Sequence, residues 1–306
     1  MIGLALGCGS ARGWAHIGVI RALQEMGIVP GVIAGTSIGA LVGAVHAAGR
    51  LDTLERIVRR LKWRDLMVFV DVVLPRGGFI DGKRVSEFIR ACAGVERIED
   101  LSVSFGAVCT DISTGREVVL ARGDLAKAVQ ASIAIPGIFT PVRWRGWVLV
   151  DGGLVNPVPV STLREMGADF VIAVDLNHGI VHARNQFRPG LEPPGKKKEE
   201  KDEGPGILES LNRKLRKVSL PSREHAGRWR RRKKEPLPGI FDVLAASLNI
   251  MEIQITRARF EVDKPDVLIR PPLAHIRFLE FTRGREAIRL GYEAARKALE
   301  GVEIPR

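Results

Sequence analysis

A serine lies between two glycines in Gly35-Thr36-Ser37-Ile38-Gly39, a stretch with the pattern Gly-x-Ser-x-Gly. A serine in this pattern becomes a nucleophile for acyl transfer when a sharp strand-to-helix turn exposes its hydroxyl. An apolar run precedes the pattern and an apolar stretch of helical length follows it, as such a turn requires. The pattern is short, so Ser37 is predicted as a nucleophile only together with partner groups elsewhere in the chain.

A glycine-rich segment near the N-terminus could bind an anion. Gly7-Cys8-Gly9-Ser10-Ala11-Arg12-Gly13 lies between an apolar run and a stretch of helical spacing. The backbone N–H groups of such a loop bind a nucleotide pyrophosphate or the oxyanion of an acyl-transfer intermediate. A dinucleotide fold requires a carboxylate at the end of the second strand, where this chain has Gly35-Thr36-Ser37. The oxyanion is therefore the favoured hypothesis.

Asp151 is a candidate for the base that accepts the serine proton. It follows the apolar run 147–150 and precedes Gly152 and Gly153, which permit a tight turn. A partly desolvated carboxylate can take a proton from serine. Two alternatives stay open at this point. Asp151 could form an ordinary Asp-Gly turn, and His275 could act as the base in the order usual for α/β hydrolases.

The elements that must position these residues alternate along the chain. Apolar runs predict strands, and apolar spacings of three and four predict helices. Strands are expected at 3–6, before Ser37, and at 104–110, 116–120, 147–150, 170–175 and 266–269. Helices are expected at 15–26, 41–48, 51–67, 81–92, 124–133, 160–166, 237–260 and 282–300. This order predicts a three-layer α/β/α fold with a mainly parallel central sheet.

Residues 31–49 carry no charged side chain and have about the length that spans a bilayer. The glycines of this stretch and the abrupt change in sequence pattern at Ser37 favour a buried strand and helix over a membrane span. Residues 69–80 are apolar but interrupted by Pro75 and by Gly77-Gly78, which predicts a mobile flap.

The net charge of +12 is concentrated in one segment. Residues 178–235 contain 17 Lys or Arg and 8 Asp or Glu and few large apolar residues. Such a composition predicts a disordered basic insert within a single domain of residues 1–306, with a short amphipathic helix at 207–218. The charge suits an anionic membrane surface or a solvated linker. Nucleic acid is disfavoured, because only Phe187 and Trp229 are available for base stacking.

Three scattered cysteines, Cys8, Cys92 and Cys109, form no CxxC pair. They argue against a disulfide framework and a zinc site and favour a reducing compartment. The N-terminal residues lack the basic region and the long apolar core of a signal peptide. These features predict a cytoplasmic protein that is peripheral at the membrane if the basic insert binds there.

Together, the glycine-rich loop, Gly-x-Ser-x-Gly and Asp-Gly-Gly, in this order, resemble the patatin-like phospholipases. Three further stretches carry the resemblance, Ala11-Arg12-Gly13-Trp14-Ala15-His16-Ile17-Gly18-Val19, Ala131-Ser132-Ile133-Ala134-Ile135-Pro136-Gly137-Ile138-Phe139 and Asp151-Gly152-Gly153-Leu154-Val155-Asn156-Pro157-Val158-Pro159. The match covers about residues 2–176. It is nearest to small single-domain bacterial members, whose core also occurs in neuropathy target esterase.

The resemblance implies a serine acyl-hydrolase that acts on lipid esters through a dyad of Ser37 and Asp151, without metal or cofactor. The backbone N–H groups expected to hold the oxyanion are those of Gly9, Ser10, Ala11, Arg12 and Ile38. The glycines expected to support the motifs are Gly7, Gly13, Gly35, Gly39, Gly152 and Gly153. Aromatic residues that could line an acyl groove, or pack in the core, are Trp14, Trp63, Trp144, Trp147 and Phe69.

The loop departs from the family pattern, which normally has four glycines before Ala-Arg-Gly. Here Cys8 and Ser10 replace two of them, and a replaced position that needs a positive φ would be strained by roughly 1–2 kcal/mol. Arg12 is expected to anchor the loop or to meet a substrate phosphate. The competing hypothesis for the whole chain is a patatin-like regulatory or adaptor protein with weak hydrolysis.

Overall fold

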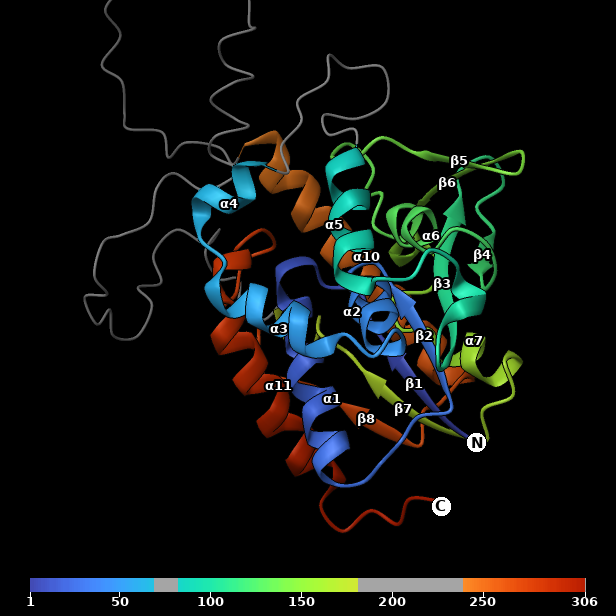
Figure 1. The fold of residues 1–306 in the computed structure, drawn as a ribbon, viewed down its shortest axis with the longest axis vertical. Coiled ribbons are helices and arrows are strands. Elements are labelled where there is room, and N and C mark those ends of the chain that lie inside the picture. Colours follow the sequence, from blue (N-terminus) through green and yellow to red (C-terminus); the bar gives the residue numbers. More distant parts are fainter. Residues whose placement is uncertain (69–81, 181–238, 306) are drawn as a thin grey trace, which may run out of the picture.

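The computed structural model describes residues 1–68, 82–180 and 239–305. Its centre is an eight-stranded sheet in the order β5-β6-β3-β2-β1-β7-β8, in which β4 also pairs with β3 (Figure 1). The strands are β1 (Ile2–Leu6), β2 (Val32–Thr36), β3 (Ser104–Asp111), β4 (Glu117–Leu120), β5 (Val142–Trp144), β6 (Trp147–Asp151), β7 (Phe170–Val174) and β8 (Val267–Ile269).

The sheet is mixed and mostly parallel, as the sequence predicted. Strands β1, β2, β3, β7 and β8 form the parallel part, whereas β4, β5 and β6 join it by antiparallel pairs. Strands β3 and β4, both expected from the sequence, form an antiparallel hairpin. Strand β5 was not predicted, because its three residues are too few for a periodicity. Arg145 and Gly146, with φ of 44° and 91°, form the two-residue turn to β6.

Helices cover both faces of the sheet. They are α1 (Ala15–Glu25), α2 (Ile38–Ala47), α3 (Leu51–Arg60), α4 (Trp63–Val68), α5 (Lys83–Ala93), α6 (Leu125–Ser132), α7 (Val160–Glu165), α10 (Ile240–Val262) and α11 (Gly284–Leu299). Short 3-10 turns are η1 (Ser10–Trp14), η2 (Ile98–Asp100), η3 (Gly152–Leu154) and η5 (Phe281–Arg283). The expected three-layer arrangement is confirmed.

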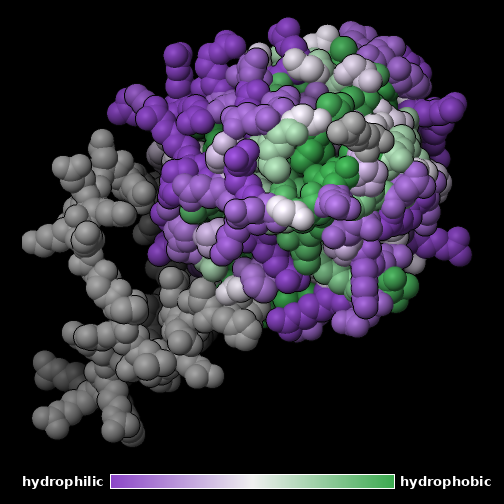
Figure 2. Space-filling view, turned by 90° about the horizontal axis from the view of Figure 1, so that it is seen from below, coloured by the Kyte–Doolittle hydropathy of each residue, from purple (hydrophilic) through white to green (hydrophobic). Residues whose placement is uncertain are grey.

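The alternation of side chains along β1 shows the two faces. Leu4 and Leu6 belong to the large core cluster with α1, α2, α5, α6 and α11, whereas Ala5 belongs to a smaller cluster with α7. This is the pattern expected when successive side chains of a strand point to opposite faces. The surface in Figure 2 is mainly hydrophilic, with apolar residues gathered near the middle of that face.

Helices α1 and α11 pack so closely that their backbones are in direct contact. A Cβ at Gly18 would lie 1.8 Å from the carbonyl oxygen of Ile288, and one at Gly291 would lie 2.0 Å from that of Ala15. No side chain fits at either position. The C-terminal helix is therefore seated directly on the helix that follows the glycine-rich loop.

The structure answers two questions about single segments, the helix expected at 51–67 and the uncharged stretch 31–49. The helix predicted at 51–67 is two helices, because Leu61 is extended and the Lys62 N–H donates to the Asp65 carboxylate at 2.8 Å. The uncharged stretch 31–49 forms β2 and α2. Among the residues that the structure describes, no helix has both the length and the apolar character needed to span a bilayer. The predicted flap at 69–80, the helix at 207–218 and the insert from residue 181 onward lie outside the described residues.

Candidate active site

Ser37 occupies the turn between β2 and α2. Its φ of 58° and ψ of −123° lie in a region that costs a non-glycine residue roughly 1–2 kcal/mol. A Cβ at Gly35 would lie 2.5 Å from the Ala40 Cα, and one at Gly39 would lie 2.0 Å from the Leu6 carbonyl oxygen. The glycines therefore permit the close packing that this strained turn requires, which is the geometry of a nucleophile elbow.

Hydrogen bonds from neighbouring elements hold the elbow. The Ser37 N–H donates to Ser132 Oγ at 2.9 Å, and the Ser132 hydroxyl donates to the carbonyl oxygen of Val108 at 2.6 Å. The Thr36 hydroxyl donates to the carbonyl oxygen of Asn156 at 2.8 Å. Ser132 was not predicted as a site residue. The sequence indicated it only through its place in the stretch 131–139, which carries the family resemblance.

Asp151 ends β6 beside the elbow. Its Oδ2 accepts a hydrogen bond from the Ser37 hydroxyl at 2.5 Å, and its Oδ1 accepts one from the Gly153 N–H at 2.8 Å. Both side chains are nearly buried, with Ser37 4% and Asp151 5% exposed. A Cβ at Gly152 would lie 2.3 Å from the Val108 carbonyl oxygen, so glycine is needed at this turn. The proximity that a Ser–Asp dyad requires is present.

Burial sets the protonation of the carboxyl group. It raises the pKa of Asp151 from 3.8 to about 6, although the hydrogen bonds from Ser37 and Gly153 favour the ionised form. Asp151 is therefore ionised at neutral pH, and its affinity for a proton is higher than that of an ordinary aspartate. Both properties suit a general base.

Two of the five expected oxyanion donors are engaged with other backbone groups. Ala11 N donates to a carbonyl oxygen of the segment before α11 at 3.0 Å, and Arg12 N donates to the carbonyl oxygen of Gly9 at 3.2 Å. Within the described residues, the N–H groups of Gly9, Ser10 and Ile38 donate to no other backbone group. The donor set is thus narrower than the sequence suggested.

The replaced glycines differ in their consequences. Ser10 has a φ of 51°, so its side chain imposes the strain expected for a lost glycine, whereas Cys8 has no positive φ and is buried. The Arg12 side chain is 0% exposed and donates to the Ile276 carbonyl oxygen at 3.0 Å and to Asn177 Oδ1 at 2.7 Å. Of the two roles expected for Arg12, the structure fits the loop anchor.

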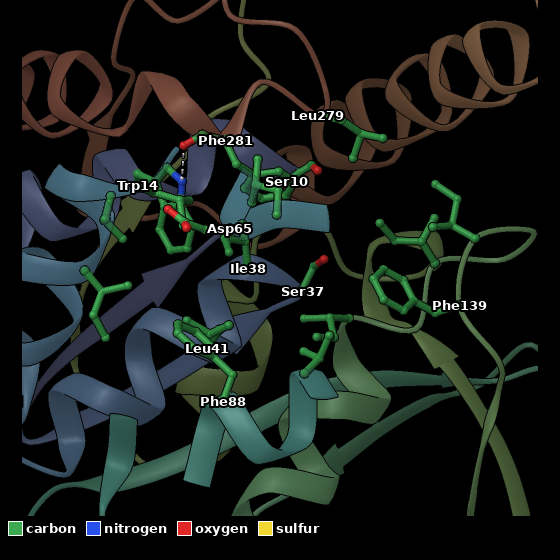
Figure 3. A pocket seen from close by; sticks show the side chains of 18 of the residues that line it. Ser10, Trp14, Ser37, Ile38, Leu41, Asp65, Phe88, Phe139, Leu279 and Phe281 are labelled. Atoms are coloured by element: carbon green, nitrogen blue, oxygen red, sulfur yellow. Dashed lines mark hydrogen bonds between the residues drawn. The ribbon is translucent and has the colours of Figure 1, made fainter. Parts of the chain in front are cut away.

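A cavity of about 610 Å³ opens beside Ser37. Its walls come mainly from α2, α3, α5 and the segment 133–139 and are mostly apolar, with Trp14, Leu41, Phe88, Ile135, Phe139 and Leu279 among them. Figure 3 shows Ser37 between Phe139 on one side and Leu41 and Phe88 on the other. Of the aromatic residues proposed from the sequence, Trp14 lines this cavity, Trp63, Trp144 and Trp147 do not, and Phe69 lies outside the described residues.

His16 and His275 are held by other groups than the dyad. His16 Nε2 lies 2.7 Å from the carbonyl oxygen of Gly7, and burial lowers the pKa of His16 to about 4. His275 Nε2 lies 2.9 Å from Glu286 Oε1 at the surface. Because the Ser37 hydroxyl contacts a carboxylate directly, the arrangement gives the histidine alternative no support.

One buried carboxyl group near the dyad was not predicted from the sequence. Glu252 projects from α10 and is 7% exposed. It lines a small hollow together with Ser37 and Asp151. No motif surrounds Glu252 in the sequence, and only the docking of α10 brings it to this place.

Comparison with known proteins finds similar sequences over nearly the whole chain. A family model described as patatin-like phospholipase matches residues 4–164, which include both Ser37 and Asp151. The chain is 33% identical to an uncharacterized NTE family protein of Mycobacterium tuberculosis, over 99% of this chain and 92% of that protein. It is 28% identical to Lysophospholipase NTE1 of Pyricularia oryzae, over 95% of this chain but only 18% of that much longer protein.

Among solved structures, the crystal structure of VipD from Legionella pneumophila matches with a TM-score of 0.54. The match covers 98% of this chain and 66% of VipD, and the two sequences are 14% identical. This likeness shows a shared fold.

Proposed function

The chain belongs to the patatin-like phospholipase family, and on that premise we propose that it is a serine acyl-hydrolase acting on lipid esters. The observation that carries the proposal is the hydrogen bond of 2.5 Å between the Ser37 hydroxyl and Asp151, beside an apolar cavity. Ser37 is the nucleophile and Asp151 the base. No step requires a group beyond these residues, the ester and water.

The reaction proceeds in two halves. Asp151 accepts the proton of Ser37 as its Oγ attacks the ester carbonyl, and the N–H groups of Gly9, Ser10 and Ile38 stabilise the oxyanion. Each such donor contributes about 3 kcal/mol to transition-state stability. The proton passes to the leaving alcohol, which departs and leaves an acyl-Ser37. Water then attacks the acyl group while Asp151 takes its proton, and Asp151 passes that proton to the departing Ser37 Oγ as the fatty acid is released.

The cavity supports an aliphatic acyl chain as the group bound next to Ser37. Its volume of about 610 Å³ is typical of small-ligand sites. Arg56, Arg60 and Asp65 also line it, so two cations and one carboxylate border the space that the substrate would enter. The printed name of the Pyricularia oryzae relative, a lysophospholipase, is consistent with this class of lipid ester.

The direct test is ester turnover by the wild type, Ser37→Ala, Asp151→Asn and His275→Ala. We expect the first two variants to lose turnover and His275→Ala to retain it. Turnover that survives Ser37→Ala rejects the mechanism, and loss with His275→Ala would restore a triad. A protein whose wild type turns over esters no faster than Ser37→Ala would be the regulatory or adaptor protein instead, a possibility that the strained Ser10 favours.

We propose further that the protein is cytoplasmic and contacts an anionic membrane surface, and the charge of residues 178–235 supports this contact. A variant with Gln at the six basic positions between 228 and 234 should bind anionic vesicles more weakly and hydrolyse a water-soluble ester as the wild type does. Equal vesicle binding by both proteins would show that this charge is not the membrane contact.

A further inference from the structure

Glu252 ends a hydrogen-bonded chain that reaches the glycine-rich loop. Its Oε2 accepts from Asn177 Nδ2 at 2.9 Å, and Asn177 Oδ1 accepts from the Arg12 guanidinium at 2.7 Å. Asn177 Nδ2 also lies 3.4 Å from Cys8 Sγ. The Glu252 side chain thus holds the group that orients both Arg12 and the start of the loop.

The other oxygen of Glu252 faces the dyad. A Cβ built on Gly153 would lie 2.9 Å from Glu252 Oε1 and 3.1 Å from Asp151 Oδ1. The two carboxyl groups therefore both border the space that a side chain at Gly153 would occupy. Glu252 also borders the hollow that Ser37, Gly9 and Ser10 line, which are the residues proposed to form and hold the oxyanion.

Three titratable groups act on the Glu252 carboxyl: Arg12 from η1, the Cys8 thiol from the loop after β1, and Asp151 from the end of β6. Asp175, which follows β7, acts on Cys8. Asp175 is paired with the Arg270 side chain at 3.2 Å.

Burial, and then the charge of Asp151, raise the pKa of Glu252 to about 8, with Arg12, Cys8 and Asn177 opposing the shift. Since Asp151 titrates lower, the pair carries one proton at neutral pH, on Glu252.

We propose that Glu252 is a positioning residue of this site, whose neutral carboxyl holds Asn177 and the glycine-rich loop, and whose ionisation stops hydrolysis. An ionised Glu252 places a second negative charge beside Asp151 and the oxyanion. Charge that develops in a buried site is strongly disfavoured by a neighbouring charge of the same sign. The inference rests on the proposed acyl-hydrolase function and adds a switch to it.

The consequence is a bell-shaped pH profile. Asp151 must be ionised, so kcat/KM rises as the pH passes through about 6. Glu252 must be neutral, so kcat/KM falls as the pH passes through about 8. A glutamine at position 252 keeps a neutral side chain at every pH, so it retains the acid limb and loses the alkaline one.

The experiment measures kcat/KM from pH 5 to 10 on a soluble, non-ionising ester, with circular dichroism at each pH to exclude unfolding. It compares the wild type, Glu252→Gln and the control Glu261→Gln, which removes an exposed carboxylate from the same helix. We expect the ratio of Glu252→Gln to wild type to be about tenfold higher at pH 9 than at pH 7, and the Glu261→Gln ratio to stay level.

An alkaline limb that persists in Glu252→Gln, or that disappears in Glu261→Gln, overturns the proposal. If Glu252→Gln does not fold, the wild type still decides, because a level kcat/KM from pH 7 to 10 is incompatible with the switch. The Ser37→Ala control separates the two proposals. Hydrolysis that survives it refutes the acyl-hydrolase function, whereas Ser37-dependent hydrolysis without the alkaline limb refutes the role of Glu252 alone.

Discussion

Replacing Asp151 by Asn should destroy activity and stabilise the protein, and both effects follow from its burial. An Asn side chain still accepts from the Gly153 N–H through its oxygen and turns its NH₂ group toward Ser37, which then has no base. Loss of a general base typically lowers the rate by about 10²–10⁴-fold. The variant should therefore retain its fold and lose turnover.

The gain in stability depends on pH in a defined direction. Because the folded-state pKa of Asp151 is raised from 3.8 to about 6, the folded state holds a proton that the unfolded state releases between these values. The stability that Asp151 contributes is thus complete below about pH 4 and is lost as the pH rises through about 6. A shift of this size corresponds to roughly 3 kcal/mol, which Asp151→Asn should recover above pH 6.

Denaturant unfolding of the wild type, Asp151→Asn and Ser37→Ala between pH 4 and 8 measures this effect. We expect the free energy of unfolding of Asp151→Asn to exceed that of the wild type increasingly from pH 4 to 6, and by a constant amount above. Ser37→Ala keeps the carboxylate and loses a hydrogen bond that opposes the shift, so its pH dependence should be at least as steep as that of the wild type. The same pH dependence in the wild type and Asp151→Asn would refute the account of a buried, destabilised base.

Four further variants test the fold and the site. Ser132→Ala leaves the buried Ser37 N–H without its partner, so it should cost about 1–3 kcal/mol in chemical unfolding and lower kcat; unchanged kcat would deny Ser132 a part in holding the elbow. Leu41→Trp fills the acyl cavity, so the binding of long-chain esters should weaken by about 0.8 kcal/mol per excluded methylene and their KM should rise. The KM for acetate esters should not change, and an equal rise for both classes of ester would place the acyl chain elsewhere. Ser10→Gly relieves a φ of 51° and should raise the free energy of unfolding by up to about 1 kcal/mol, whereas a loss would show that the Ser10 side chain stabilises the loop. Gly18→Leu places a Cβ 1.8 Å from the Ile288 carbonyl oxygen and should cost at least about 3 kcal/mol in thermal unfolding, and a normal melting temperature would contradict the close packing of α1 and α11.

The sequence was most informative where geometry is local. The glycines around Ser37 and after Asp151 are needed within a few residues of the groups they serve, so the elbow and the turn leave a pattern in the chain. The Asp124 cap of α6 is likewise local, since its side chain accepts from the Lys127 N–H. Parallel pairing followed from the alternation of strands and helices.

Features that depend on distant contacts were missed. Ala11 N is engaged by a segment that precedes α11, and neither partner signals the other in the sequence. Glu252 and Asp151 come together across Gly153 only because α10 packs there. The break at Leu61 is set by one capping bond at Lys62, against a periodicity that runs through it.

The central claim is that Ser37 becomes acylated with Asp151 as its base, and mass spectrometry of the acid-quenched protein after mixing with an activated ester tests it most directly. The account predicts one acyl adduct in the wild type, on the peptide that contains Ser37, absent from Ser37→Ala and formed at least a hundredfold more slowly in Asp151→Asn. An adduct on another residue, or one that forms on Ser37 equally fast without the Asp151 carboxylate, would contradict it.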